Sequence, residues 1–338
     1  MRSGWILSAV LCLGSKLFAA DAPPEGVIIA EYKGWPDSVT LPAPDAKIKA
    51  VIVPLIGGRI QHYGPDDANI IYEHAGSDGK TLAKNKNFWA GGYNLDIGPE
   101  TRRLTPHPDL WMGPYEVKPL GPNTVNTLSV LDKSVGIQLD KTFKMDPKTG
   151  ALHIMQRMKN IGEKDTNFCL WDRTLCKGGG FAFFTVNPKS KFAKGWAQRI
   201  KYDGEGAFNT TDPNLENVKV IDGVVLIECK GKEGKMGGDT NAGWLAYVRG
   251  KQLYIKIFPY DPKGNYSDAG NSVEIYWSPM VAEIEPLGPE IVLKPGEEAT
   301  FPETWLLIDL PEEATTFEAA RKLVDRVTQA VDTVRKGK

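Results

Sequence analysis

Residues 135–160 read VGIQLDKTFKMDPKTGALHIMQRMKN and contain two patterned runs separated by a turn. In the first run, apolar side chains fall on one face of an extended chain and polar side chains fall on the other. The second run repeats this spacing, and DPKTG at 146–150 has the composition of a tight turn. The stretch therefore predicts two antiparallel strands joined as a hairpin. The residues of the packed face are Val135, Ile137, Leu139, Phe143 and Met145, followed by Leu152, Ile154 and Met158.

Short apolar runs of the same kind recur along most of the chain. Gly, Pro and Asp separate them, and no helical pattern intervenes. Strands in this order indicate antiparallel sheets packed face to face, so we expect an all-β fold. No internal repeat or linker interrupts residues 23–312, which favours one large sandwich domain. The further runs lie at residues 47–54, 124–132, 224–230, 243–248, 252–259, 272–277 and 299–310.

Residues 313–338 follow a different pattern. Their apolar residues recur at spacings of three and four, which indicates one amphipathic helix. Thr315 and Glu318 fit a capping box at its start. We expect the helix to dock on the sandwich and cover a sheet edge, with binding to a partner as the alternative. The apolar positions are Phe317, Ala320, Val324, Val327, Val331 and Val334.

The composition limits the partners of the chain. The 338 residues are 41% hydrophobic and 25% charged, which is enough apolar material for a large core. The 41 basic and 42 acidic residues give a formal net charge of −1. So balanced a charge lacks the basic surplus of proteins that bind nucleic acid or anionic lipid. We therefore expect no nucleic-acid partner.

Residues 1–22 have the order of a secretory signal peptide. Arg2 precedes an apolar run at residues 5–13, and small residues at 19, 20 and 22 lead into a proline-rich start. The apolar run is too short to span a membrane, and Leu11 before Cys12 does not fit a lipid-attachment site. We expect cleavage between Ala20 and Pro23 and a periplasmic or secreted protein without membrane insertion.

Cysteine and histidine spacing argues against a metal or a disulfide framework. Removal of the signal peptide leaves Cys169, Cys176 and Cys229, which permit at most one disulfide. The four histidines are scattered, and none lies at a ligand spacing from a cysteine. Gly178–Gly180 lacks the lysine and helix of a phosphate-binding loop. The sequence therefore predicts no metal site and no cofactor.

Residues 88–115, FWAGGYNLDIGPETRRLTPHPDLWMGPY, combine aromatic and polar side chains in one long loop. Aromatic faces beside Arg, Asn and Asp suit a ligand that is polar at its edges and apolar on its faces, and a sugar is the commonest example. The tryptophans either stack on such a ligand or cover the core. Arg102 and Arg103 point opposite ways in an extended chain, so at most one faces the site. The ligand-binding candidates of this loop are Trp89, Asn94, Arg102 and Trp111.

Arg59 is a further candidate, because Gly57 and Gly58 let the chain turn tightly just before it. Its guanidinium either offers paired hydrogen bonds to a ligand or forms a salt bridge to a neighbouring loop.

Two other stretches place charges in apolar strands. In CLWDRT, Trp171, Asp172 and Arg173 follow a core-like segment, and inward charges there either line a pocket or form a structural ion pair. We favour the pocket for all three residues. Glu283 and Glu285 in MVAEIEPLGP are two residues apart and share one face of a strand. They either serve as a base and a hydroxyl ligand or lie on a solvated face.

The order of four segments resembles the galactose mutarotase-like superfamily, and within it most closely the DUF4380 branch. The segments are residues 51–64, 88–100, 160–174 and 276–308. The resemblance implies an antiparallel β-supersandwich whose open concave face binds carbohydrate. It also implies that Glu283 matches the general-base glutamate that removes the proton from the anomeric hydroxyl.

The same resemblance separates two functions. The superfamily's middle strand normally carries a histidine that protonates the ring oxygen, but this chain has NFCLWDRT there and no histidine after His153. We therefore expect an exported carbohydrate-binding protein without efficient epimerase activity. An aldose 1-epimerase-like or other carbohydrate-active enzyme that uses Glu283 as general base is the alternative.

Overall fold

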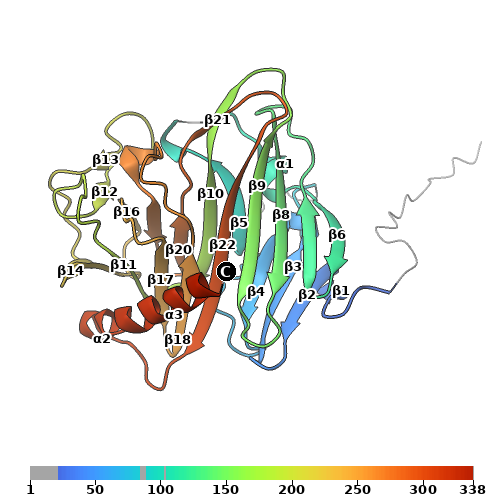
Figure 1. The fold of residues 1–338 in the computed structure, drawn as a ribbon, viewed down its shortest axis with the longest axis horizontal. Helices are drawn as coiled ribbons and strands as arrows, with labels where there is room; N and C mark the ends of the chain where they lie inside the picture. Colours follow the sequence, from blue (N-terminus) through green and yellow to red (C-terminus); the bar gives the residue numbers. More distant parts are fainter. Residues whose placement is uncertain (1–21, 84–88, 103, 338) are drawn as a thin grey trace, which may run out of the picture.

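The computed structural model describes residues 22–83, 89–102 and 104–337. The predicted signal peptide at 1–22 therefore lies almost wholly outside the described residues. Two large antiparallel sheets pack face to face (Figure 1), so the predicted all-β sandwich is confirmed.

The first sheet has twelve strands, eleven of them in one pairing path. In pairing order these are β1 (Ile28–Tyr32), β2 (Trp35–Ala43), β3 (Ile48–Val53), β4 (Arg59–Gly64), β5 (Tyr93–Gly98), β10 (Thr166–Lys177), β20 (Val281–Pro286), β19 (Val273–Trp277), β16 (Gly234–Gly238), β12 (Ala197–Arg199) and β13 (Phe208–Asn209). The twelfth, β21 (Ile291–Leu293), pairs with β10.

The second sheet has ten strands in a single path. In pairing order these are β14 (Val218–Ile221), β15 (Val224–Glu228), β11 (Phe181–Thr185), β17 (Trp244–Arg249), β18 (Gln252–Ile257), β22 (Glu298–Asp309), β9 (Leu152–Asn160), β8 (Ile137–Met145), β7 (Thr124–Leu128) and β6 (Glu116–Gly121). Short 3-10 turns η1 (Pro54–Ile56), η2 (Ala75–Ser77), η3 (Glu100–Arg102) and η4 (Asp268–Gly270) and helix α1 (Pro108–Met112) lie in the connections.

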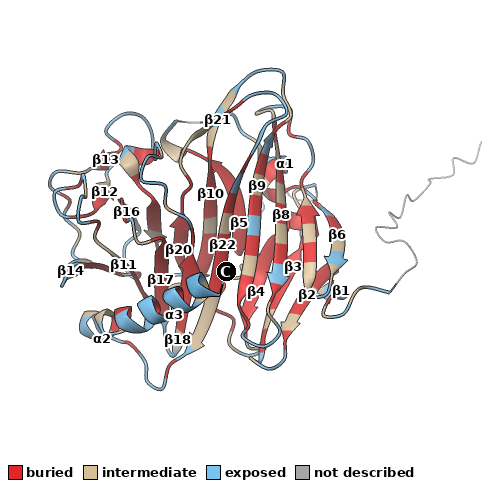
Figure 2. Cartoon of the chain, viewed as in Figure 1, coloured by how far each residue is buried: buried red, intermediate tan, exposed pale blue. Residues whose placement is uncertain are grey.

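The hairpin predicted from residues 135–160 is formed by β8 and β9. Their register runs from Ile137 opposite Asn160 to Met145 opposite Leu152. The apolar face of both strands is buried against the first sheet, and Figure 2 shows buried residues concentrated in the strands of both sheets. Alternation of apolar and polar residues therefore set the register here, because a slip by one residue would turn the apolar face outward.

Lys141 is an exception on the packed face of β8. Its side chain is fully buried, and its ammonium donates to the carbonyl oxygens of Gly57 and Gly58 at 2.6 and 2.9 Å. The same ammonium lies 4.6 Å from the ring centroid of Tyr115. Lys141 thus holds the β3–β4 turn against the second sheet, and burial lowers its pKa well below the usual value.

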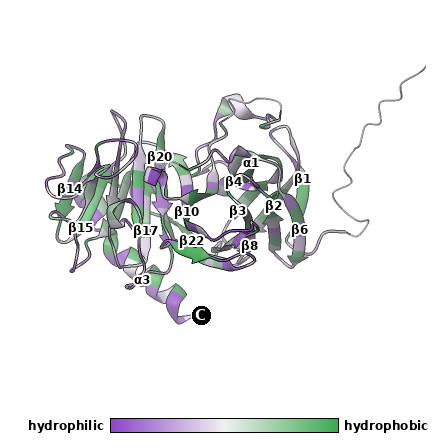
Figure 3. Ribbon diagram, turned by 90° about the horizontal axis from the view of Figure 1, so that it is seen from above, coloured by the Kyte–Doolittle hydropathy of each residue, from purple (hydrophilic) through white to green (hydrophobic). Residues whose placement is uncertain are grey.

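The C-terminal helix has two segments, α2 (Phe317–Arg321) and α3 (Val324–Lys336). They pack on the outer face of the second sheet, where Phe317 lies 5.2 Å from the ring of Phe181. Figure 3 shows α3 outside the layer that contains β17. The helix docks on the sandwich as predicted, and Phe317 reaches the edge strand β14, where Lys219 lies 4.5 Å from its ring centroid. It also covers the face of the sheet, which was not predicted, because strands β11 and β17 are apolar on both faces.

The start of this helix also differs by one residue from the predicted capping box. Thr316 is the N-cap residue, and its side chain accepts a hydrogen bond from the backbone N–H of Ala319 at 3.1 Å. Thr315 does not cap the helix. The two adjacent threonines differ only in the backbone geometry that the preceding loop imposes, so sequence could not choose between them.

The three cysteines of the described chain, Cys169, Cys176 and Cys229, are free thiols and are buried. Burial raises the pKa of Cys229 to about 12. The possibility of one disulfide, left open by the sequence, is thereby settled. Among the helices of the described residues, none has the length and apolar character needed to cross a membrane.

Candidate functional site

One row of side chains runs across four neighbouring strands on the outer face of the first sheet. Lys235 on β16 lies opposite Tyr276 on β19, which lies opposite Glu283 on β20. The pairing of β12 with β16 continues the row to Arg199. Side chains alternate along a strand, so the intervening residues Met236, Ile275 and Ile284 point into the core. We call Arg199, Lys235, Tyr276 and Glu283 the floor row.

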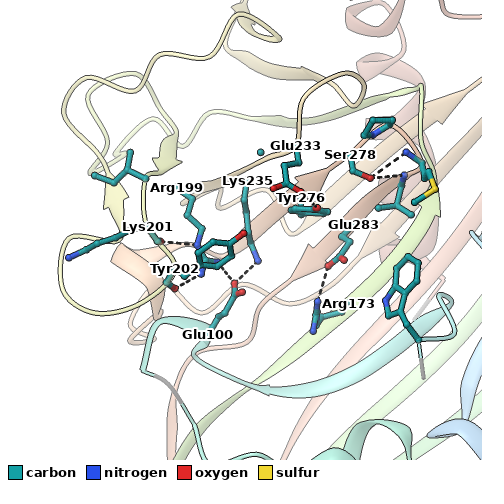
Figure 4. A pocket seen from close by; sticks show the side chains of 16 residues that line it. Glu100, Arg173, Arg199, Lys201, Tyr202, Glu233, Lys235, Tyr276, Ser278 and Glu283 are labelled. Carbon is teal, nitrogen blue, oxygen red and sulfur yellow. Dashed lines mark hydrogen bonds and ion pairs between the residues drawn. The ribbon is translucent and has the colours of Figure 1, made fainter. Parts of the chain in front are cut away.

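The floor row forms the base of a pocket of about 890 Å³ (Figure 4). One rim is the segment after β12, with Ile200 and Tyr202. The other rim contains Met280, from the β19–β20 turn, and Trp89. Apolar rims above a polar base are typical of sites that bind ligands with apolar faces and polar edges.

Lys235 is the electrostatic centre of the site. Its ammonium lies 2.8 Å from a carboxylate oxygen of each of Glu100, Glu274 and Glu285. Burial alone would lower the pKa of Lys235, but these carboxylates raise it well above the usual value. Arg199 also pairs with Glu100. Both cations of the floor row are therefore held by protein carboxylates.

Glu274 lies beside the floor row, on the same face of β19 as Tyr276, and is fully buried. Burial raises its pKa to about 8, against the attraction of Lys235. Burial likewise raises the pKa of Glu285. The carboxylate cluster therefore carries less negative charge near neutral pH than its composition suggests.

Glu283 is paired with Arg173 of β10. The guanidinium lies 3.2 Å from the Glu283 carboxylate and 3.9 Å from that of Asp96. Burial favours a raised pKa for Glu283, but Arg173, a hydrogen bond with Glu285 and the charge of Lys235 together outweigh burial and leave that pKa below the usual value. Glu283 is thus an ionised hydrogen-bond acceptor whose basicity the ion pair weakens.

His107 extends this chain of polar contacts. Its Nε2 lies 2.8 Å from Asp96, and its Nδ1 lies 2.7 Å from the carbonyl oxygen of Thr105. Burial lowers the pKa of His107, but Asp96 outweighs burial and raises it. A loop distant in sequence from β10 and β20 thus links an imidazole, through Asp96 and Arg173, to Glu283.

Two tryptophan rings lie close to the Arg173 guanidinium beside the pocket. Arg173 lies 4.7 Å from the ring centroid of Trp171 and 5.7 Å from that of Trp111. The indole N–H of Trp171 donates to Glu285 at 2.9 Å. These contacts fix the Arg173 side chain, and with it the position of Glu283.

The structure brings several predicted ligand-binding residues together. Trp89, Arg173 and Glu283 line the pocket, while Trp111, Trp171 and Glu285 contact the lining residues. Asn94 lies opposite Arg173 in the sheet, is buried, and has no hydrogen-bond partner for its amide within the described residues. Glu283 and Glu285 share the outer face, as their spacing predicted.

Arg59 is not among the pocket-lining residues. It is 1% exposed, and its guanidinium donates to the carbonyl oxygens of Gly91 at 2.8 Å and Trp111 at 3.2 Å. Neither predicted alternative describes it: Arg59 braces two loops through backbone carbonyls.

Asp172 and Arg102 lie away from the pocket, which corrects two expectations. Asp172 points between the sheets, where it pairs with Lys256 of β18, because its neighbours Trp171 and Arg173 on the same strand face outward. Arg102 forms an ion pair with Glu290 at 3.0 Å and lies over the ring of Phe168. Arg103 lies outside the described residues.

Sequence reasoning missed most of the floor row and its partners. Arg199 comes from a strand of three residues and Lys235 from a glycine-rich one, so neither showed a strand pattern. Tyr276 had a signal, because SVEIYW alternates and places Glu274 and Tyr276 on one face. Within the described ranges, no group of three or more His, Cys, Asp or Glu is placed to hold a metal ion.

No protein-family model matches this sequence, and a search of curated proteins finds no match. Assignment to the DUF4380 branch therefore stays a prediction. Solved structures do resemble the fold. A galactose mutarotase-like protein from Lactobacillus casei has 14% identity and a TM-score of 0.54, over 84% of this chain and 100% of its own.

Two further structures agree with this one in fold. A candidate aldose 1-epimerase from Escherichia coli has 12% identity and a TM-score of 0.53, over 78% of this chain and 97% of its own. A galactose mutarotase-like protein from Clostridium acetobutylicum has 10% identity and a TM-score of 0.53, over 84% of this chain and 98% of its own. With two packed antiparallel sheets and these neighbours, the chain has the galactose mutarotase-like β-sandwich fold.

Proposed function

We propose that this protein binds carbohydrate in the pocket above the floor row. The observation that carries the proposal is the combination of a polar row on four strands with apolar rims at Tyr202, Met280 and Trp89. Sugar hydroxyls bind to hydrogen-bond donors and acceptors, and the faces of the sugar ring pack against apolar or aromatic side chains. The names of the fold neighbours, which include galactose mutarotase-like and aldose 1-epimerase, also support a sugar ligand.

Substitution of Trp89 tests the site. Trp89→Ala is expected to weaken binding of a sugar, first identified on a glycan array, by about 0.5–1.5 kcal/mol, because a stacked ring face is lost. Trp89→Phe keeps an aromatic face and should bind within about threefold of the parent. Isothermal titration calorimetry measures both. If the alanine variant folds and binds as tightly as the parent, the site lies elsewhere.

Binding without efficient catalysis fits the geometry better than epimerisation does. Ring opening needs a base at the anomeric hydroxyl and an acid at the ring oxygen. Glu283 is in the pocket, but its ion pair with Arg173 weakens it as a base. Arg173 remains protonated and is a poor proton donor. His107 supports the enzyme alternative, because Asp96 and Arg173 connect it to Glu283.

Polarimetry separates these two functions. With freshly dissolved glucose and galactose, we expect no saturable acceleration of mutarotation. Among the described residues that line the pocket there is no histidine to act as the acid, which typically contributes about 10²–10⁴-fold. Glu283→Gln is the matched variant, since it keeps the shape and removes the base. Saturable acceleration that disappears in Glu283→Gln would make this protein an epimerase.

We also propose export to the periplasm or the medium, on the basis of residues 1–22. Expressed in a Gram-negative host, the protein is expected in the periplasmic or secreted fraction, with an amino terminus between Ala20 and Pro23. Mass spectrometry of the purified protein measures that terminus. Recovery of cytoplasmic protein that retains Met1 contradicts export.

A further inference from the structure

We infer that the pocket takes a neutral oligosaccharide of at least two sugar units rather than a single sugar. This inference rests on the proposed carbohydrate binding and specifies the ligand of the same site. It depends on the length of the floor row, on the separation of the two rims, and on the way in which the cations of the site are neutralised.

The length of the site exceeds the needs of one sugar ring. The floor row crosses four strands, and the three intervals between them span roughly 14 Å at the usual strand spacing. The pocket volume of about 890 Å³ lies in the upper part of the range of about 300–1,000 Å³ for small-molecule sites. A single pyranose would leave much of the row in contact with water.

Two apolar rims stand at different ends of the floor row. Tyr202 is 77% exposed and lies beside Arg199, whose guanidinium is 5.2 Å from its ring centroid. At the other end, Met280 is 58% exposed, and its sulfur lies 3.9 Å from the hydroxyl of Tyr72.

Trp89 belongs to the second rim, because its ring lies 5.5 Å from the ring of Tyr72. Figure 4 shows Tyr202 near Arg199 and Glu100, and Ser278, from the turn of Met280, at the far side near Glu283. Apolar and aromatic side chains at the edge of a polar pocket can contact the ring faces of a bound sugar. Each rim can cover the face of one sugar ring, so two rims indicate two sugar units.

The charge of the site favours a neutral ligand. Three of the four basic residues that line the pocket are neutralised: Lys235 is shared by three carboxylates, Arg199 pairs with Glu100, and Arg173 pairs with Glu283. The fourth, Lys201, is exposed, so water screens its attraction for a sugar carboxylate. A sugar carboxylate would have to displace one of these glutamates or lie close to Glu233 and Glu283, which also line the pocket. Like charges in a partly desolvated site repel strongly. Neutral hydroxyls can instead bridge the existing ion pairs without separating them.

The experiment is a binding series on the mature protein. An array of neutral and uronic-acid glycans of one to six units selects a series, and calorimetry then compares its monomer, dimer and tetramer. We expect the tetramer to bind at least tenfold more tightly than the monomer, and we expect trigalacturonate to bind more weakly than neutral trimers. Tenfold corresponds to about 1.4 kcal/mol.

A variant of the exposed rim assigns the second sugar unit. Tyr202→Ala should remove most of the gain in affinity between the sugar monomer and the tetramer. The Tyr202 ring is exposed, so it contributes to ligand contact rather than to the core. Binding of the monomer, where it is measurable, should change less than threefold. Tyr260→Ala, at a tyrosine that does not line the pocket, is the matched control and should retain the full gain.

The outcomes distinguish this inference from the proposed function. Equal affinity for monomer and tetramer, or stronger binding of the uronate series, overturns the neutral oligosaccharide while leaving carbohydrate binding intact. An unchanged chain-length gain in Tyr202→Ala overturns the role of that rim. Absence of binding to every glycan on the array overturns the proposed function and the inference together.

Discussion

Replacing Lys256 with methionine is expected to lower the free energy of unfolding by about 3–5 kcal/mol, the usual cost of removing one partner of a buried ion pair. Lys256 is fully buried between the sheets. Its ammonium pairs with the carboxylate of Asp172 and lies 3.4 Å from that of Glu303. Methionine fills a similar volume, so the uncompensated charge and not a cavity causes the loss. Chemical denaturation measures it.

The loss of unfolding free energy in Lys256→Met should increase with pH. Burial and the nearby Glu303 charge raise the pKa of Asp172 well above its usual value, against the attraction of Lys256. Removing Lys256 raises that pKa further. A carboxyl group with a raised folded-state pKa reduces stability progressively as pH rises from the unfolded value of about 4 towards the folded value. The Lys256→Met variant should therefore lie closer to the parent at pH 4 than at pH 8.

A second substitution provides the rescue. In the Lys256→Met background, Asp172→Asn removes the uncompensated carboxylate charge. The amide oxygen of the asparagine can still accept the hydrogen bond from the Thr174 hydroxyl, which is 2.7 Å long in the parent protein. Glu303 keeps the donors of Gln156 and Trp305, at 3.0 and 2.8 Å. We expect a recovery of about 1–3 kcal/mol at pH 8, the cost of a buried unsatisfied group.

An exposed lysine on the same hairpin serves as control for this prediction. Lys251→Met, in the β17–β18 turn, should change stability by less than about 0.5 kcal/mol. A loss that is independent of pH and is not recovered in the double variant would show that Asp172 does not carry the effect.

The sheets were predictable because one face of most strands is buried against a single core. Alternation in the 135–160 hairpin gave the correct faces for most residues. The polar residues Lys141 and Gln156 depart from it on the buried face, where Lys141 donates to backbone carbonyls of the opposite sheet and Gln156 donates to Glu303. The sequence did not predict that the C-terminal helix covers the outer face of β11 and β17. A continuous apolar run shows that both faces of a strand are buried, but it does not show which element packs on each face.

The site was predictable only where strand alternation applied. It placed Glu283 and Glu285 on one face, and the same rule separates Asp172 from Trp171 and Arg173, which the grouping of CLWDRT as one pocket motif overlooked. Lys235 and Arg199 reach the floor row through pairing of strands distant in sequence. No local pattern encodes such pairings, so the centre of the site emerged only from the fold.

Replacing Lys235 with methionine is expected to cost about 3–5 kcal/mol of stability and to abolish carbohydrate binding at neutral pH. The ammonium neutralises Glu100, Glu274 and Glu285, each 2.8 Å away. Without it, these carboxylates repel one another beside the floor row. Denaturation and calorimetry on the same preparation measure both effects.

The parent protein already indicates the direction of the pH dependence. Burial raises the pKa of Glu274 to about 8 in the folded protein, whereas the unfolded value is about 4.3. The folded state therefore binds more protons between these values, and this group reduces stability as pH rises from about 4.3 to about 8. Glu274→Gln should flatten that dependence, because an amide does not titrate in this range. The substitution keeps the hydrogen bond that Asn271 Nδ2 donates to Oε1 of residue 274, which is 3.0 Å long in the parent protein.

Lys235→Met should steepen the same dependence, because loss of the cation raises the carboxyl pKa values further. We expect the variant to be folded at pH 5, where protonation relieves the repulsion, and strongly destabilised at pH 8. Lys201→Met, at an exposed lysine of the same pocket, should change stability by less than about 0.5 kcal/mol at both pH values.

Binding measured at pH 5 separates the structural role of Lys235 from its role in the floor row. If the variant is folded there and still binds no sugar, Lys235 itself contributes a donor to the ligand. If it binds as the parent does at pH 5, its ammonium serves only to neutralise the carboxylates. A variant as stable as the parent at pH 8 would contradict the prediction. Glu100 would keep Arg199, but the fully buried Glu274 and Glu285 would lose their ion-pair partner and cannot both stay ionised at low cost.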